Sequence, residues 1–114
     1  LKPFHNLLTI ENSNTECFIT GEKIPVDKIS IDHVIPWSYM YSDDLWNLVF
    51  VHSDLNSSKS NRLPDEEIII RLDERNRRLL NLMKNSEVRS KHLHDLNLAV
   101  AKDYLRHHWI GFKG

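Results

Sequence analysis

The residues of this chain best suited to chemistry are the neighbours Asp32 and His33, followed by Asn47, Asn56 and Lys59. The Asp32 carboxylate and the Asn56 amide oxygen are hard ligands, of the kind that Mg²⁺ or Mn²⁺ prefers. Two protein ligands would leave other coordination positions open for water and phosphate oxygens, as a catalytic ion requires. We therefore expect one divalent ion here, placed to neutralise the charge that builds on a phosphate group as one of its bonds breaks.

His33 is the candidate general base, because a neutral imidazole accepts a proton near pH 7. On a regular strand its side chain and that of Asp32 would point to opposite faces, so a bulge or turn is needed for both to reach one site. Asn47 is expected to bond nearby backbone groups and to hold the loop that carries this pair. Taken singly, each of these residues has an ordinary explanation as a cap, turn or surface residue.

Lys59 and Arg62 are the candidates for contacting nucleic acid. Lys59 follows Asn56 by three residues, about one helical turn, so both would project from one face. Lys59 can pair with a phosphate next to the one that reacts, and Arg62 is a weaker candidate for the same contact. The net charge is −1, but the basic groups concentrate after residue 56. They could form a stripe that binds phosphates, or a solvated helix face in which acidic residues are interspersed.

The short elements of an α+β core are expected around these residues. Apolar runs and alternation predict strands, and two such runs flanking a glycine-containing turn predict a hairpin. Pro36 would end the first strand of the core, and Ser53 or Asp54 can cap a helix. The expected elements are a hairpin at residues 16–19 and 23–26, strands at residues 29–35 and 48–51, and a helix from residue 53 to about residue 62.

Two helices are expected in the C-terminal half, where the apolar period becomes helical. Ser86 is expected to cap the second helix, which would run from Glu87 to about Trp109. Residues 1–11, in contrast, show no clear period. The apolar face of the first C-terminal helix would consist of Ile69, Leu72, Leu79, Leu80 and Met83.

The bulk composition limits the class of protein. The chain has 114 residues, which suits one domain: a lead-in at residues 1–15 from a preceding region, a core at residues 16–64, and a helical extension at residues 65–114 packed on that core. No apolar run approaches the roughly 20 residues that span a bilayer, so no membrane partner is expected. The single cysteine, Cys17, excludes an internal disulfide and fits a reducing cytoplasm.

In order and spacing, the polar residues resemble the motif of the HNH nucleases, also called ββα-metal nucleases. That motif runs through an Asp-His or His-His pair, a central asparagine, and a final histidine or asparagine with a lysine three residues later. The resemblance covers residues 16–64 and is especially close to the HNH domains of RNA-guided CRISPR effectors. It implies an α+β fold with a ββα-metal core and two further C-terminal helices. It also implies that Asp32 and Asn56 bind the metal ion, that His33 is the base and that Asn47 braces the loop.

The sequence departs from the family at the structural zinc that many HNH domains carry between two Cys-x-x-Cys knuckles. The matching positions here are Cys17 and Thr20 in one knuckle, and His52 and Leu55 in the other. A closed zinc site needs four ligands, and only Cys17 and His52 could bind. We therefore expect no structural zinc.

The resemblance implies an endonuclease domain that cuts phosphodiester bonds of DNA, or else of RNA. A bacterial or phage-type restriction or phage-defence protein is the expected setting, with target choice made by a preceding region. Two alternatives stay open. One is a nucleic-acid-binding module that no longer cuts, and the other is a helical interaction domain built around residues 72–109, in which the polar motif is incidental.

Overall fold

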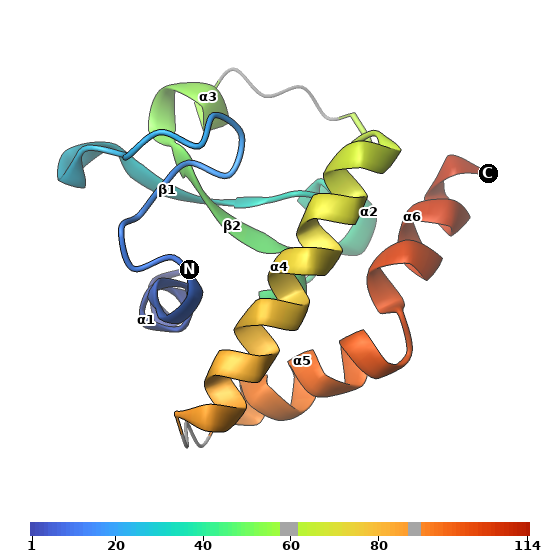
Figure 1. The fold of residues 1–114 in the computed structure, drawn as a ribbon. Coiled ribbons are helices and arrows are strands. Elements are labelled where there is room, and N and C mark those ends of the chain that lie inside the picture. The colour runs from blue at the N-terminus through green and yellow to red at the C-terminus, as the bar shows by residue number, and fades with distance from the viewer. Residues whose placement is uncertain (58–61, 87–89) are drawn as a thin grey trace.

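The computed structural model describes residues 1–57, 62–86 and 90–114, apart from the side chain of Ser57. A two-stranded sheet lies among helices from both ends of the chain (Figure 1). The α+β class with C-terminal helices, expected from the sequence, is confirmed. In chain order the elements are α1 (Lys2–Glu11), η1 (Val26–Lys28), β1 (Ile29–His33), α2 (Trp37–Met40), η2 (Leu45–Asn47), β2 (Leu48–His52), α3 (Ser53–Ser57), α4 (Glu66–Asn85), α5 (Lys91–Ala101) and α6 (Tyr104–Lys113).

The strands β1 and β2 pair antiparallel along their whole length, with Asp32 opposite Val49 and His33 opposite Leu48. The strand expected at residues 48–51 is present, and all four of its side chains are buried. The first strand ends earlier than expected, at His33 instead of at residue 35. The backbone bends at residues 34 and 35 before Pro36, which stands at the N-cap of α2.

The hairpin expected before these strands is present in reduced form, as a single antiparallel bridge between Glu16 and Lys23. At its tip the Gly21 amide donates to the Cys17 carbonyl at 2.7 Å. Gly21 has a φ of 76°, which glycine adopts without the steric penalty of a Cβ atom. The hairpin therefore needs glycine at this position, as its sequence pattern indicated.

The helix α4 carries the apolar face that its sequence predicted. It begins where Asp65 Oδ1 accepts a hydrogen bond from the Ile68 amide at 3.1 Å, a favourable N-cap contact. Within the described ranges no helix is both long and apolar enough to cross a bilayer. The expected core residues of α4 are all buried: Ile69, Leu72, Leu79, Leu80 and Met83.

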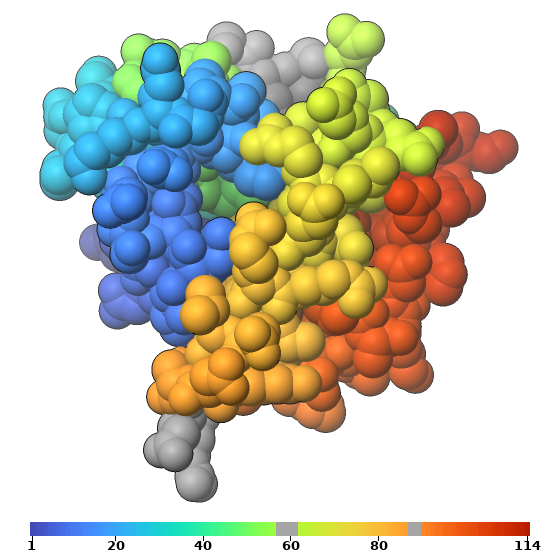
Figure 2. Space-filling model, viewed as in Figure 1, coloured from blue at the N-terminus to red at the C-terminus, as the bar shows by residue number. Residues whose placement is uncertain are grey.

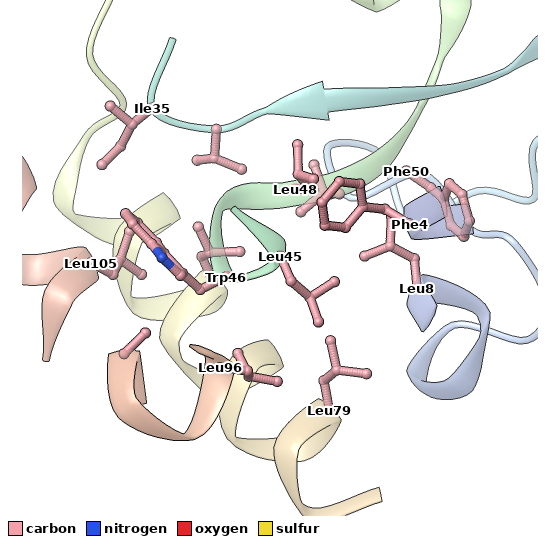
Figure 3. Packing of buried hydrophobic residues seen from close by; sticks show 14 of the residues in the cluster. Phe4, Leu8, Ile35, Leu45, Trp46, Leu48, Phe50, Leu79, Leu96 and Leu105 are labelled. Carbon is pink, nitrogen blue, oxygen red and sulfur yellow. The ribbon is translucent and has the colours of Figure 1, made fainter. Parts of the chain in front are cut away.

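The N-terminal segment differs from the expectation, because residues 2–11 form the helix α1. Its Phe4 and Leu8, four residues apart, are buried and lie beside Phe50 of β2 (Figure 3). Arg78 of α4 reaches Glu11, with 3.4 Å between Nε and Oε2. Two buried positions are too few to establish a helical period from sequence, so the absence of a clear period did not mean the absence of a helix.

The expected second C-terminal helix is in fact two helices, α5 and α6. The break falls at Asp103, whose φ of 52° is left-handed and cannot continue a right-handed helix. The N-cap of α5 is Ser90, whose hydroxyl accepts a hydrogen bond from the His92 amide at 3.1 Å. Ser86 is the C-cap of α4, so its expected role as an N-cap was wrong. The expected start of the helix at residue 87 lies outside the described residues.

Candidate active site

Asp32 and Asn56 line the same pocket, although they come from β1 and α3. The pocket has a volume of about 470 Å³ and also receives Arg62, which precedes α4. Its remaining walls include the apolar side chains of Val34, just after β1, and of Val49 on β2. The structure thus brings together three of the polar residues singled out from the sequence. Lys59, the fourth candidate on this side, lies outside the described residues.

A hydrogen bond connects the two elements that carry the candidate metal ligands. The Asn56 side-chain amide donates from Nδ2 to Ser30 Oγ at 2.7 Å. Ser30 lies two residues before Asp32 on β1, so the two side chains share one face of the sheet. Sequence reasoning missed Ser30, although its spacing from Asp32 would have placed it on this face.

His33 occupies a different environment from Asp32. Its Nε2 atom lies 2.7 Å from Asp43 Oδ1, and its side chain is 14% exposed. No bulge interrupts the pairing of the described strands at this point, because Asp32 and His33 each face one partner on β2. The sequence allowed for a bulge that would bring both side chains to one site, whereas the backbone bends only after His33. Nothing in the sequence indicated Asp43, in the loop before η2, because its contact with His33 spans ten residues.

Asn47 is fully buried and bonds the backbone just after β1. Its Oδ1 accepts from the Ile35 amide at 2.8 Å, and its Nδ2 donates to the Ile35 carbonyl at 2.9 Å. Its own carbonyl accepts from the Val34 amide at 3.0 Å. These three bonds hold the bend after His33 against the start of β2.

Two further buried residues of α4 hold the segment that presents Asn47. Asn76 donates from Nδ2 to the Trp46 carbonyl at 2.9 Å, and Arg75 donates from Nη2 to the Leu45 carbonyl at 3.2 Å. Arg75 Nε also donates to Asn76 Oδ1 at 3.1 Å. Burial lowers the pKa of Arg75 to about 10, partly offset by the nearby carboxylate of Glu11. The sequence suggested that Arg75 belongs to the exposed basic groups, but its side chain is buried and bonds the backbone of η2.

The basic residues of α4 do not form an uninterrupted positive surface. Arg71, Arg75 and Arg78 line a pocket of about 230 Å³ between α1, the hairpin and α4. Three glutamates, at positions 11, 16 and 74, line the same pocket and balance that charge. In Figure 2 this face shows a hollow between the blue N-terminal segment and the yellow helix α4. A balanced pocket has no general attraction for phosphate, which favours the structural explanation of these arginines.

Cys17 is a free, buried cysteine in the hairpin. Burial opposes ionisation of the thiol, but hydrogen bonds from the backbone of His52, Thr20 and Ile19 and from the Thr20 hydroxyl hold its pKa below the ordinary value. His52 Nδ1 accepts from the Asp54 amide at 3.2 Å, so this imidazole caps the start of α3. Within the described ranges, no three His, Cys, Asp or Glu side chains are grouped to hold a metal ion. Asp32 and Asn56, as a pair of hard donors, fit an open catalytic ion.

Residues 17–65 match the family model of the HNH endonucleases. This segment is an HNH domain. The match begins at the buried Cys17 of the hairpin and ends at Asp65, the N-cap of α4. It therefore covers β1, β2 and α3, with the loop between the strands. The HNH family is a family of nucleases, and the helices α1, α4, α5 and α6 lie outside the matched segment.

The buried Asn47 amide gives a first testable prediction. Replacing Asn47 by Ala should leave the buried Ile35 N–H and C=O groups without partners, at about 1–3 kcal/mol for each group. We expect the free energy of unfolding to fall by about 2–6 kcal/mol, measured by urea denaturation. Asn81→Ala, at an exposed position of α4, is the matched control and should change stability little. A loss below 1 kcal/mol for Asn47→Ala would show that the bridge is not structurally important.

The knuckle positions give a second prediction. Thr20 and Leu55 stand where related domains present thiolates, and neither side chain can replace a thiolate ligand. The hydrophobic core should therefore hold the fold without zinc, and the melting temperature should be the same before and after dialysis against EDTA. Circular dichroism with parallel elemental analysis provides the measurement. Stoichiometric zinc whose removal unfolds the protein would contradict this expectation.

Proposed function

We propose that this HNH domain is a metal-dependent endonuclease that hydrolyses phosphodiester bonds of DNA. The observation that carries the proposal is the meeting of Asp32 and Asn56, from two separate elements, in one pocket of a nuclease-family domain. Both are hard oxygen donors, and two such donors leave room for water and phosphate on Mg²⁺ or Mn²⁺. When bound, the ion would supply positive charge to the phosphate and to the leaving oxygen.

In this proposal His33 takes the proton from the attacking water. Its contact with Asp43 supports that role, because an ionised carboxylate favours the tautomer in which Nε2 carries the hydrogen. In that neutral tautomer Nδ1 is the atom able to accept a proton. His33 is the last residue of β1, so we place the reacting phosphate across the end of this strand, within reach of both His33 and Asp32.

The remaining candidate residues would position the backbone or the substrate. Asn47 would keep the bend after His33 in place through its bonds to Ile35, and it takes no part in proton transfer. Arg62 lines the pocket and would contact a phosphate next to the scissile one. We assign the same kind of contact to Lys59 on its spacing from Asn56 alone.

We further propose a setting for the domain. It would act in the cytoplasm as part of a larger restriction or phage-defence protein, with residues 16–64 as the catalytic core and residues 65–114 as an extension packed on it. The 16–64 division agrees with the family match, and the contacts of Arg75 and Asn76 with η2 support the packing of the extension. Residues 1–15 would lead in from a region that selects the target.

One observation favours a second candidate function, a nucleic-acid-binding module that does not cut. His33 does not line the pocket shared by Asp32 and Asn56, and its Nε2 is engaged by Asp43. Such a module would bind a phosphate through the ion and leave the bond intact. Cleavage and binding must therefore be measured separately.

A third prediction tests the proposal by nicking of supercoiled plasmid in Mg²⁺, with EDTA as the blank. Asp32→Ala and Asn56→Ala should reduce the rate by on the order of 10²-fold or more, because each removes a ligand of the ion. His33→Ala should reduce it by about 10²–10⁴-fold, the usual contribution of a general base, while metal and DNA binding persist. Exposed residues of the C-terminal helices supply matched controls: Asp95→Ala, Asn81→Ala and His94→Ala.

The outcomes separate the two candidate functions. Parental rates in Asp32→Ala or Asn56→Ala would refute the metal assignment. Loss of metal and DNA binding in His33→Ala would indicate a structural histidine. A wild-type protein that binds DNA with Mg²⁺ but never nicks it would favour the non-cleaving module.

A further inference from the structure

We infer that Ser30 is a positioning residue for metal binding: its hydroxyl holds the Asn56 amide so that the oxygen end is presented to the ion. This inference rests on the proposed function, because it assumes that Asn56 is a ligand. The observation behind it is the 2.7 Å hydrogen bond from Asn56 Nδ2 to Ser30 Oγ, which joins α3 to β1.

An asparagine ligand needs such a partner more than a carboxylate does. Its side chain has two ends of similar shape, and only the oxygen can coordinate a cation. An unrestrained amide samples both ends and several rotamers, and binding must then select one at a cost in affinity. A hydrogen bond that occupies the nitrogen end removes part of that cost in advance, as groups around metal ligands commonly do.

The geometry around Ser30 suits this task. Ser30 and Asp32 alternate with Ile31 on β1, so the hydroxyl and the carboxylate project from one face of the sheet. Both Ser30 and Asn56 are half-buried, where a hydrogen bond is less exposed to competition from water. Asp32 and Asn56 line the pocket, and the nitrogen end of Asn56 is the end engaged by Ser30. The oxygen end is thus the one left to face an ion shared with Asp32.

The strand position of Ser30 allows a test that changes the hydroxyl and little else. Threonine and valine have nearly the same shape, both suit a β-strand, and only threonine retains a hydroxyl. The two variants Ser30→Thr and Ser30→Val therefore form a matched pair, which avoids the loss of side-chain volume in Ser30→Ala. Ser86→Ala is the remote control, because it removes a hydroxyl that donates to the Met83 carbonyl at the far end of α4 (Figure 1).

The experiment measures Mn²⁺ binding to the full 114-residue chain by titration calorimetry, without nucleic acid. We expect Ser30→Val to weaken Mn²⁺ binding by about 10- to 100-fold, while Ser30→Thr and Ser86→Ala stay within about threefold of the wild type. In two-dimensional NMR, the side-chain amide resonances of Asn56 should move in Ser30→Val and stay near their wild-type positions in Ser30→Thr.

The outcomes distinguish this inference from the proposed function. Equal Mn²⁺ affinity in Ser30→Val and Ser30→Thr, with binding lost in Asn56→Ala, overturns the role of Ser30 and leaves the metal site standing. A wild-type protein that does not bind Mn²⁺, or an Asn56→Ala variant that binds it normally, overturns both. An equal loss of Mn²⁺ affinity in Ser30→Val and Ser30→Thr also overturns the role of the hydroxyl. It would show that the larger side chain disturbs β1.

Discussion

The bond between the buried Asn47 amide and both backbone groups of Ile35 is the interaction on which the rest of the site depends. Burying an amide is costly unless its donor and its acceptor both find partners. Here Ile35 satisfies both. The start of β2, where Asn47 lies, is therefore held next to the backbone that follows β1. This contact fixes the position at which β1 ends, and with it the positions of Asp32 and His33 at the end of the strand.

The same buried polar network ties the HNH domain to a helix outside it. Asn76 and Arg75 donate to the carbonyls of η2, the turn that ends in Asn47. Helix α4 therefore holds this turn in place through two hydrogen bonds. At the other end of the segment, Trp109 of α6 donates from Nε1 to the Pro64 carbonyl at 2.7 Å. The Trp46 ring stacks on His108, with 5.6 Å between the ring centroids. A segment as short as residues 17–65 buries little apolar surface by itself, which explains why helices from both ends of the chain complete its core.

The sequence predicted those features that depend on local pattern. The apolar stripe from Ile69 to Met83 was correct because a long helix repeats its period several times. Asp32 and Asn56 line one pocket, and their roles there stay a prediction. The bonds of Ser30 with Asn56 and of Asp43 with His33 could not be foreseen, because each joins separate segments that only the folded chain brings together. The break at Asp103 depends on one left-handed residue, and aspartate adopts that conformation in few contexts.

The central claim is that Asp32 and Asn56 share one catalytic ion, and the most direct measurement is anomalous diffraction from crystals soaked in Mn²⁺. The expected result is one strong anomalous peak in the pocket, in contact with an Asp32 carboxylate oxygen and with Asn56 Oδ1. Water or a substrate phosphate should complete its coordination. A peak at Cys17 and His52 instead, or a fully occupied ion that contacts neither Asp32 nor Asn56, would contradict the account.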